Sequence, residues 1–495
     1  MKKLLILFVF VFNLTVAQTF TNYNYDTQNS DQLVDILEYE TGYLLTGYIT
    51  DSASSVAYDY YGASVLIKLT KSGNPIDTII TTAFGYTELA QASVYKDGYF
   101  YVFGTTNPQN DSINLVVTKI DTSFNIIEKK LYPQINGSYF VSVLKTNNET
   151  DSTIYCIGTF FDYSIYMFRS FVYKYNFNTM EIDKSVYLPN GFLIYNLLAN
   201  EAEDKYIVTV NSSSFFSRVL SYDSNFNLIS DDTLYSTNYP GLTIQSVINI
   251  KEYQDSLYLV LGSEPLSLPI NNPYYSIRVM ILQVLDSNFQ VIDYKYWYND
   301  SLTDVAMSAE NGIISNLSNE YFVGATIHKN IYYPKDGLLI VKLDSVLNTL
   351  WQKHIECSAE SMRLMNMLPT DDGGVLILYE EQASISGAEL KNSKLIKIDS
   401  NGEVTSIIDF QLPVRRLSVD ISPNPTTDKL IVSLLSPKEI ISELQIFDMQ
   451  GKQILFKSIG AQQTIIDVSK LAGGAYIIKG ISNAGEGFSA KFIKK

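Results

Sequence analysis

A short segment recurs seven times along this chain, and it constrains the fold more than any other feature. Each copy is an apolar strand that closes on a polar, usually acidic, residue and runs into a turn. The closing residues lie at positions 70, 121, 176, 223, 286, 344 and 399. The period of about 55 residues is typical of a protein built from one repeated supersecondary unit. The copies are Val65–Thr70, Val116–Asp121, Phe171–Asn176, Val219–Asp223, Ile281–Asp286, Leu339–Asp344 and Lys394–Asp399.

Other strands complete each unit. Upstream of most copies lies an apolar strand that often ends in glycine, and before it a partly apolar strand such as Thr243–Ile248. A short strand such as Val404–Phe410 follows the turn. Four strands per unit, seven units and no helical periodicity predict an all-β, seven-bladed β-propeller over residues 18–410, in which radial stacking buries both faces of each sheet. An open β-solenoid or two β-sandwiches would supply the strands but not the sevenfold recurrence.

Composition excludes several functions. The formal net charge is −16 and the pI is near 4.7, which argues against nucleic acid or an anionic membrane as partner. Cys156 and Cys357 cannot build a disulfide framework, and we expect buried thiols. The two histidines, His328 and His354, lie in different units, so we predict no zinc site. No nucleophile elbow, phosphate loop or metalloprotease helix is present, and we predict no cofactor and no catalytic residue.

The N-terminus has the features of a secretory signal. Met1-Lys2-Lys3 is followed by the apolar run Leu4–Phe12, which is too short to span a bilayer. We predict a signal peptide over residues 1–17, with cleavage between Ala17 and Gln18. Further along, no stretch approaches the length of a membrane helix, so we expect no membrane span.

The pattern changes after Phe410. Residues 411–416 read as a linker, and residues 417–495 contain about seven short strands separated by Pro and Gly turns. This arrangement predicts a small immunoglobulin-like β-sandwich.

Several motifs in this C-terminal stretch occur together in a known order. They are Pro423-Asn424-Pro425, the turn with Asp448, Gly451 and Lys452, the strand start with Gly474 and Tyr476, and a basic tail. The stretch resembles the type IX secretion system C-terminal sorting domain, type A. That resemblance implies two-step export through the periplasm, the type IX machinery as a partner, and release outside the cell or anchoring on the outer-membrane surface. The alternative is an unrelated binding sandwich.

The N-terminal repeats loosely resemble those of bacterial secreted β-propellers. The closest copy runs from Lys342-Leu343-Asp344-Ser345 to Trp351-Gln352-Lys353. This resemblance implies a fold and no activity.

The recurring acidic residues have two interpretations. An Asp that opens a Ser-Asn-Gly-type hairpin accepts hydrogen bonds from its own turn, and we favour this structural role over calcium binding or catalysis. Repetition from blade to blade also keeps these residues apart. They are Asp121, Asp223, Asp286, Asp344 and Asp399.

Aromatic pairs mark the connections between the second and third strands, which a propeller opens on one face. We take them as candidate ligand-binding residues, because aromatic rings stack on sugars and peptides. The alternative is ordinary packing in a chain that is 13% aromatic. Nearby in sequence lie Tyr58, Tyr163, Tyr166 and His328. The pairs are Tyr60 and Tyr61, Phe160 and Phe161, Phe215 and Phe216, Tyr274 and Tyr275, and Tyr332 and Tyr333.

Two functions remain open from the sequence. We favour a non-catalytic secreted or cell-surface protein whose propeller binds a glycan or another protein. The alternative is a secreted hydrolase or lyase that acts on an extracellular polymer at the propeller face. Convergence of several carboxylates with perturbed pKa values on the propeller axis would favour the enzyme.

Overall fold

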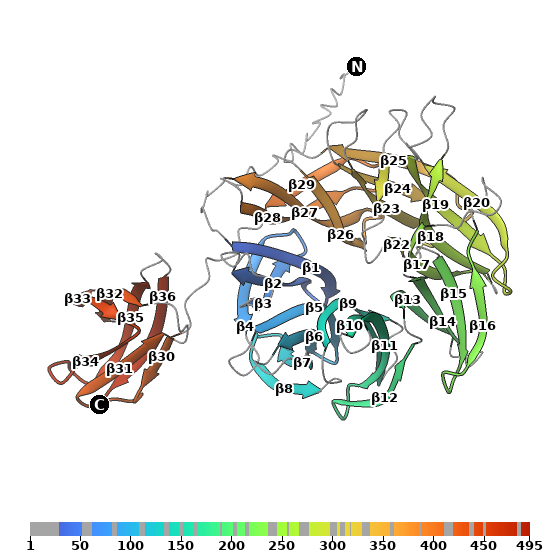
Figure 1. The fold of residues 1–495 in the computed structure, drawn as a ribbon. Coiled ribbons are helices and arrows are strands. Elements are labelled where there is room, and N and C mark those ends of the chain that lie inside the picture. Colours follow the sequence, from blue (N-terminus) through green and yellow to red (C-terminus); the bar gives the residue numbers. More distant parts are fainter. Residues whose placement is uncertain are drawn as a thin grey trace, which may run out of the picture. The chain divides into compact units, whose positions relative to one another are not determined.

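Strands make up the regular structure of the chain in the computed structural model (Figure 1). The part of the chain that the structure describes contains no helix long and apolar enough to cross a bilayer. The described residues are 29–51, 62–81, 87–107, 114–132, 138–147, 152–162, 166–188, 191–200, 205–212, 217–235, 245–254, 257–266, 277–297, 304–306, 312–316, 318–328, 337–356, 361–385, 388–409, 419–434, 440–448, 452–482 and 487–495.

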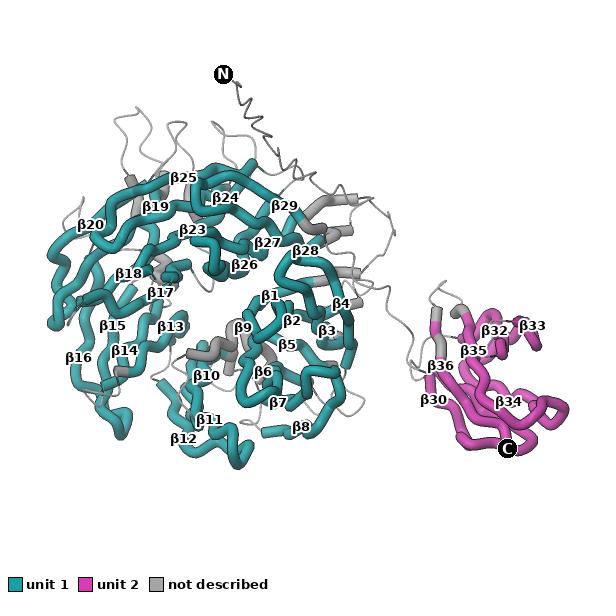
Figure 2. The backbone as a smooth tube through the Cα atoms, turned by 180° about the vertical axis from the view of Figure 1, so that it is seen from behind, with its two compact units in different colours: residues 1–22, 28–410 teal, residues 23–27, 411–495 magenta. Residues whose placement is uncertain are grey.

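These residues form two compact units, which cover the described residues between 29 and 409 and between 419 and 495 (Figure 2). The first unit contains seven antiparallel sheets, each built from consecutive strands. Blade 1 consists of β1 (Asn29–Tyr39), β2 (Gly42–Asp51), β3 (Gly62–Thr70) and β4 (Pro75–Thr81). Blade 2 consists of β5 (Thr87–Lys96), β6 (Tyr99–Asn107), β7 (Asn114–Asp121) and β8 (Ile126–Tyr132). Blade 3 consists of β9 (Ser138–Asn147), β10 (Thr153–Asp162), β11 (Met167–Asn176) and β12 (Glu181–Tyr187).

The remaining blades follow the same order. Blade 4 consists of β13 (Phe192–Asn200), β14 (Lys205–Ser212), β15 (Ser217–Asp223) and β16 (Leu228–Thr233). Blade 5 consists of β17 (Gln245–Tyr253), β18 (Leu257–Leu266), β19 (Ile277–Leu285) and β20 (Val291–Trp297). In blade 6 the first strand is split into β21 (Asp304–Ala306) and β22 (Ile313–Ser315), which both pair with β23 (Tyr321–His328), and β24 (Gly337–Leu343) and β25 (Thr349–Glu356) follow. Blade 7 consists of β26 (Ser361–Pro369), β27 (Val375–Ile385), β28 (Ala388–Ile398) and β29 (Val404–Asp409).

The seven sequence copies occupy the third strand of the seven blades, which confirms the predicted seven-bladed propeller. The first strand of each blade lies innermost and contacts the first strands of its neighbours, and the fourth strand forms the exposed outer edge (Figure 1). Apolar side chains fill the spaces between blades. Phe100 and Val102 of blade 2, for example, pack with Leu44 and Leu66 of blade 1.

The recurring glycine of the second strand serves close packing and does not end the strand. β2 continues to Asp51, beyond Gly47. A Cβ atom added at Gly47 would lie 2.0 Å from the carbonyl oxygen of Gln32 on β1, so no larger residue fits there. On β1 the register with β2 shifts between Leu33 and Asp35, which marks a β-bulge in the innermost strand.

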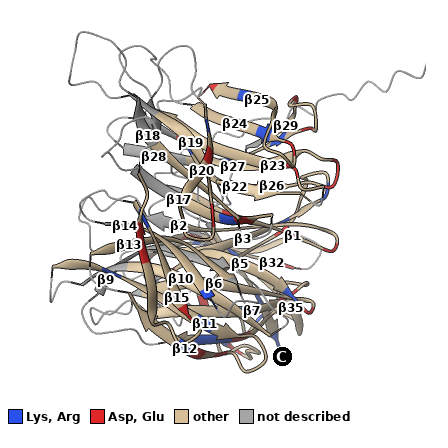
Figure 3. Cartoon of the chain, turned by 90° about the vertical axis from the view of Figure 1, so that its right-hand side faces the viewer, with Lys and Arg blue, Asp and Glu red and all other residues tan. Residues whose placement is uncertain are grey.

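The turns between third and fourth strands lie on one side of the propeller, which we call the turn face. Acidic residues colour several of these turns along the right-hand edge of Figure 3. Lysine side chains of the preceding blade contact two of these turns. Lys68 donates to the carbonyl oxygen of Thr122 at 2.7 Å and lies 4.4 Å from the centre of the Phe124 ring. Lys184 makes the same pair of contacts with Ser224 and Phe226.

Blades 1 and 7 close the ring without exchanging a strand, since each sheet uses only its own consecutive strands. Asp35 of β1 replaces the missing strand pairing. Its carboxylate accepts hydrogen bonds from Nδ2 of Asn366 on β26 at 2.7 Å, and from the backbone N and Oγ of Ser93 on β5 at 2.7 and 2.9 Å. One side chain therefore joins the innermost strands of blades 7, 1 and 2.

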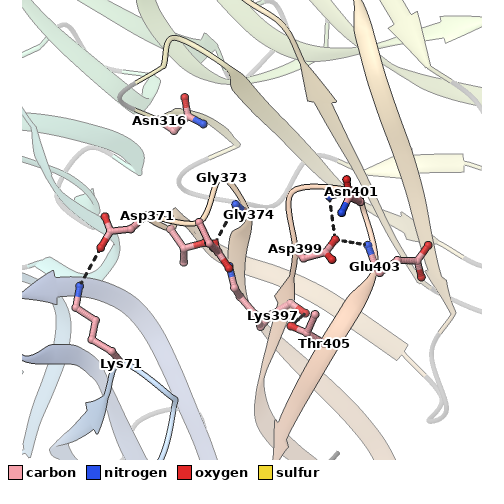
Figure 4. A network of polar contacts seen from close by, with 12 residues as sticks. Lys71, Asn316, Asp371, Gly373, Gly374, Lys397, Asp399, Asn401, Glu403 and Thr405 are labelled. Carbon is pink, nitrogen blue, oxygen red and sulfur yellow. Dashed lines mark hydrogen bonds and ion pairs between the residues drawn. The ribbon is translucent and has the colours of Figure 1, made fainter. Parts of the chain in front are cut away.

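Two further contacts support this closure. The backbone N of Leu33 donates to Oγ of Ser393 on β28 at 2.8 Å. On the turn face, Lys71 after β3 forms an ion pair with Asp371 of the turn before β27 at 3.8 Å (Figure 4). An exposed pair at this distance contributes little, so the buried bonds at Asp35 and Leu33 hold the ring closed.

The second unit contains seven strands in two sheets, as expected for a small immunoglobulin-like sandwich. One sheet has the order β30-β31-β34 and the other β33-β32-β35-β36. Leu430, Ile446 and Phe492 lie in the buried layer between them. The strands are β30 (Val419–Ser422), β31 (Lys429–Leu434), β32 (Ile441–Asp448), β33 (Gln453–Ala461), β34 (Gln463–Asp467), β35 (Gly474–Ser482) and β36 (Gly487–Lys494).

Replacement of Asp35 by alanine should destabilise the propeller by on the order of 1–3 kcal/mol for each buried donor left without its acceptor. Urea unfolding of the full chain measures the change. Asp371→Ala removes an exposed carboxylate from the same blade junction and is the matched control. Equal, small effects of the two variants would show that Asp35 does not close the ring.

Candidate functional site

The recurring acidic residues form the turns that the sequence predicts. Oδ1 of each accepts hydrogen bonds from the backbone N of the second and fourth residues that follow, at 2.7–3.0 Å. Asn125, Asn227 and Asn348 donate a third bond to Oδ2 of their aspartates. The third residue after each aspartate has positive φ. At three turns this residue is a phenylalanine, namely Phe124, Phe226 or Phe289.

These bonds stabilise the ionised carboxylates. Hydrogen bonds from Asn227, first from its side chain and then from its backbone, hold the pKa of Asp223 below its ordinary value of 3.8, and Asn125 does the same for Asp121. The Asp371–Gly374 segment is also a turn, in which Oδ1 of Asp372 accepts a bond from the backbone N of Gly374 (Figure 4). Among the described residues, no group of three or more His, Cys, Asp or Glu side chains is placed to hold a metal ion.

Two carboxylates inside the propeller have perturbed pKa values. Burial raises the pKa of Asp35 against the opposing bonds from Ser93 and Asn366. Burial also raises the pKa of Glu88 on β5, although Lys129 lies 2.6 Å from its Oε2. Each carboxylate bonds to its own partners, and the two do not share a hydrogen-bond partner among the described contacts.

Most of the predicted aromatic ligand residues lie outside the described residues. These are Tyr60, Tyr61, Phe215, Phe216, Tyr274, Tyr275, Tyr332 and Tyr333, and the predicted cleavage site at Ala17 and Gln18 lies outside as well. The backbones of Phe160 and Phe161 belong to the end of β10, opposite Arg169 and Phe168 of β11, and their side chains are not described. The structure therefore neither gathers the ten residues nor separates them.

Two arginines that each stack on an aromatic ring lie on the face opposite the turn face, and the sequence analysis did not identify them. The guanidinium of Arg169 on β11 lies 5.1 Å from the ring centre of Tyr187, and that of Arg218 on β15 lies 5.5 Å from Phe192. Tyr166, which precedes β11, has 78% of its surface exposed and a φ of 52°. The only sequence signal was position, because Arg169 and Arg218 both fall at the start of a third strand.

In the second unit, the Pro423-Asn424-Pro425 motif holds the last strand. Oδ1 of Asn424 accepts the backbone N of Ile493 at 2.9 Å, and its Nδ2 donates to the carbonyl oxygen of Lys491 at 3.1 Å. Thr426 continues the contact, since its backbone pairs with Ile493 and Lys495. The motif and the basic tail are therefore one structural element, with Phe492 between them turned into the core.

The other predicted sorting residues also have structural roles. The backbone N of Asp448 donates to the carbonyl oxygen of Lys452, and Oδ1 of Asp448 accepts the backbone N of Lys452, while Gly451 lies outside the described residues. Gly474 opens β35 opposite Lys494. Two residues later, Tyr476 stacks on Phe492 with ring centres 5.5 Å apart and donates its hydroxyl to the carbonyl oxygen of Ala472.

Residues 420–495 match the family described as the secretion system C-terminal sorting domain, in agreement with the type IX sorting domain expected from the motifs. The chain is thus an exported β-propeller protein with a sorting domain for the type IX machinery. This domain directs it to the cell surface or the extracellular space. No curated protein sequence matches the chain.

Several solved structures resemble it in fold. They include the hydrazine synthase of Kuenenia stuttgartiensis, with 10% identity and a TM-score of 0.38 over 69% of this chain and 90% of that one. The β-propeller domain of the trilobed protease from Pyrococcus furiosus has 11% identity and a TM-score of 0.43 over 78% and 100%. The apocarotenoid oxygenase of Synechocystis has 10% identity and a TM-score of 0.45 over 79% and 95%. These likenesses say nothing about the activity of this chain.

Replacement of Asp223 by alanine should lower thermal stability at neutral pH, because the turn loses its acceptor for three hydrogen bonds. The carboxylate has a lowered pKa, so its stabilisation is present above about pH 3.8 and is lost as the pH falls through the folded-state value. Asp223→Asn keeps one acceptor oxygen and should retain part of the stability. Calorimetry with and without a chelator measures both effects, and a large loss of stability on chelation would instead indicate a bound cation.

Replacement of Asn424 by alanine should free the basic tail and reduce export severalfold, with the protein accumulating in the periplasm. Deletion of residues 417–495 should block export completely. Immunoblots of cell fractions and medium measure the distribution. Gln453→Ala changes an exposed amide on β33 of the same domain and is the control. Unchanged secretion of the deletion variant would contradict the sorting role.

Proposed function

We propose that this chain is a non-catalytic binding protein, delivered by the type IX machinery, whose propeller presents one face to an extracellular glycan or protein. In this proposal residues 1–17 are a signal peptide, 18–410 the binding propeller, 411–416 a linker and 417–495 the sorting domain. The aromatic pairs that the sequence places in the connections opposite the turn face supply the binding surface.

The state of Asp35 is the observation that carries the proposal. An acid or base catalyst has to exchange its proton with a substrate, and general acid–base reactions use a titratable partner within reach. Asp35 lies on an innermost strand, yet both of its oxygens accept bonds from Ser93 and Asn366. Among the described contacts, neither a second carboxylate nor a histidine touches it. Its geometry suits a structural connection between blades.

A hydrolase or lyase is the second candidate. The raised pKa values of Asp35 and Glu88 favour it, because catalytic acids are often carboxyl groups whose pKa burial has raised. The partners of both groups argue against it, since Glu88 is paired with Lys129 and the hydroxyl of Thr81 bonds the same ammonium group.

A glycan array probed with the mature full chain tests the proposal. We expect selective binding, reduced at least about tenfold by the paired substitution Tyr274→Ala and Tyr332→Ala if the aromatic connections form the binding surface. Tyr294→Ala on the outer strand β20 removes an exposed tyrosine away from that surface and is the control. Release of soluble fragments from a bound polymer would support the enzyme, and unchanged binding by the paired variant would remove the aromatic pairs from the site.

A further inference from the structure

The four-stranded sheet of the sorting domain carries large apolar side chains on the side that faces away from the core. Ile446 of β32 belongs to the core, so its neighbours Gln445 and Phe447 point to the opposite side of the sheet. Ile477 on β35 lies opposite Phe447. On the edge strand β33, Phe456 lies opposite Gln445 and has 51% of its surface exposed. We call this side the outer sheet face.

The outer sheet face continues onto the last strand, β36. Lys491 lies opposite Ile477, and Ile493, which is 46% exposed, lies opposite Ala475. Phe492 between them belongs to the core, which confirms that Lys491 and Ile493 point outward. Apolar side chains therefore extend over all four strands of the sheet. An exposed apolar surface of this kind marks an interaction site on a soluble domain.

Lysines border these apolar side chains. Nζ of Lys479 on β35 lies 5.4 Å from the centre of the Phe447 ring, so both side chains belong to this face. Lys491 adds a second exposed positive charge, and Glu443 is the acidic residue on this side of β32. Residues 417–495 contain nine lysines and seven acidic residues, although the whole chain has a net charge of −16. The outer sheet face is therefore suited to an apolar surface that carries carboxylates at its border.

The residues of the sorting motifs are engaged within the domain. Asn424 binds the backbone of β36 at Lys491 and Ile493, and so fixes the strand that presents these two side chains. Tyr476 stacks on Phe492 in the core. These motif residues shape the domain and leave little of themselves for a partner. A protein that recognises the folded domain has to contact side chains that remain exposed, and the outer sheet face supplies them.

We propose that a protein of the type IX machinery docks on the outer sheet face. Its docking surface is apolar, covers Phe456, and pairs carboxylates with Lys479 and Lys491. A second copy of this chain is a poorer partner, because a symmetric contact would bring the lysines of both copies together. The proposal goes beyond the binding function of the propeller and does not depend on it. The residues of the docking face are Phe447, Phe456, Ile477, Lys479, Lys491 and Ile493.

Competition for export tests the proposal. An epitope-tagged full chain and an untagged full chain are produced together in cells that contain the type IX machinery. The untagged wild-type chain should lower export of the tagged chain, because both occupy the same docking site. Untagged Phe456→Ser should require at least about tenfold more protein for the same effect, since a buried aromatic anchor contributes at least this factor at a protein interface. Immunoblots of periplasm and medium measure the tagged chain.

Charge variants test the two lysines. Competition should weaken in the paired variant Lys479→Gln and Lys491→Gln, and weaken further in Lys479→Glu and Lys491→Glu, because reversed charges repel the carboxylates of the partner. Ile465→Ser is the matched control, since it removes an apolar side chain that is 55% exposed on β34 of the other sheet. Thermal unfolding of the purified full chains should show the same transitions for all these variants.

Full competition by Phe456→Ser or by the paired Glu variant, or an equal loss with Ile465→Ser, would overturn the proposal. A fall in melting temperature that parallels the loss of competition would also overturn it, because the face would then act through stability. A dimer in light scattering, or flotation with phosphatidylglycerol vesicles, that Phe456→Ser abolishes would assign the face to a second copy or to lipid instead. Export of a chain without residues 417–495 would contradict the sorting function itself.

Discussion

The need to cover both faces of seven apolar sheets governs this structure. A single four-stranded sheet with two apolar faces is unstable in water, and only a neighbour on each side removes those faces from solvent. Six junctions are joined by the chain itself, but the seventh has no covalent connection and no shared strand. Asp35 of blade 1 bridges it through Asn366 of blade 7, while its other oxygen accepts bonds from Ser93 of blade 2, so a buried hydrogen-bonded carboxylate completes the ring. The rest of the propeller depends on that closure.

Much of this fold could be predicted from the sequence because each repeat forms its strands and turns through interactions between residues that are close in sequence. An apolar third strand, an Asp-led turn and a glycine-bearing second strand recur with regular spacing, and each has its own local cause. The aspartates could be assigned to turns because Asp bonds its own backbone over two and four residues. The phenylalanines at positive φ, such as Phe124 and Phe226, could not be foreseen, since their rings contact lysines of the preceding blade and that contact is set by tertiary structure.

The candidate site was harder to predict, because it also depends on contacts that only the tertiary structure creates. The stack of Arg169 on Tyr187 joins two adjacent strands of blade 3, and the stack of Arg218 on Phe192 joins two strands of blade 4 that are separated by β14. Aromatic pairs could be counted along the chain, but their meeting point depends on tertiary geometry. The sorting domain was predicted more completely, because Asn424 and its partner strand lie within one small domain with recognisable motifs.

The bond between Asp35 and Asn366 joins residues 331 positions apart, whereas Asp35 and Ser93 are 58 positions apart. Loop-closure entropy makes the longer link costlier by about 1.5 kcal/mol, and it cannot form before blade 7 exists. The bond between Asp35 and Asn366, which closes the ring, therefore forms only after the last blade of the chain. Until blade 7 has formed, the two end blades of the growing propeller each keep one apolar face without a neighbouring blade, and such uncovered faces favour aggregation.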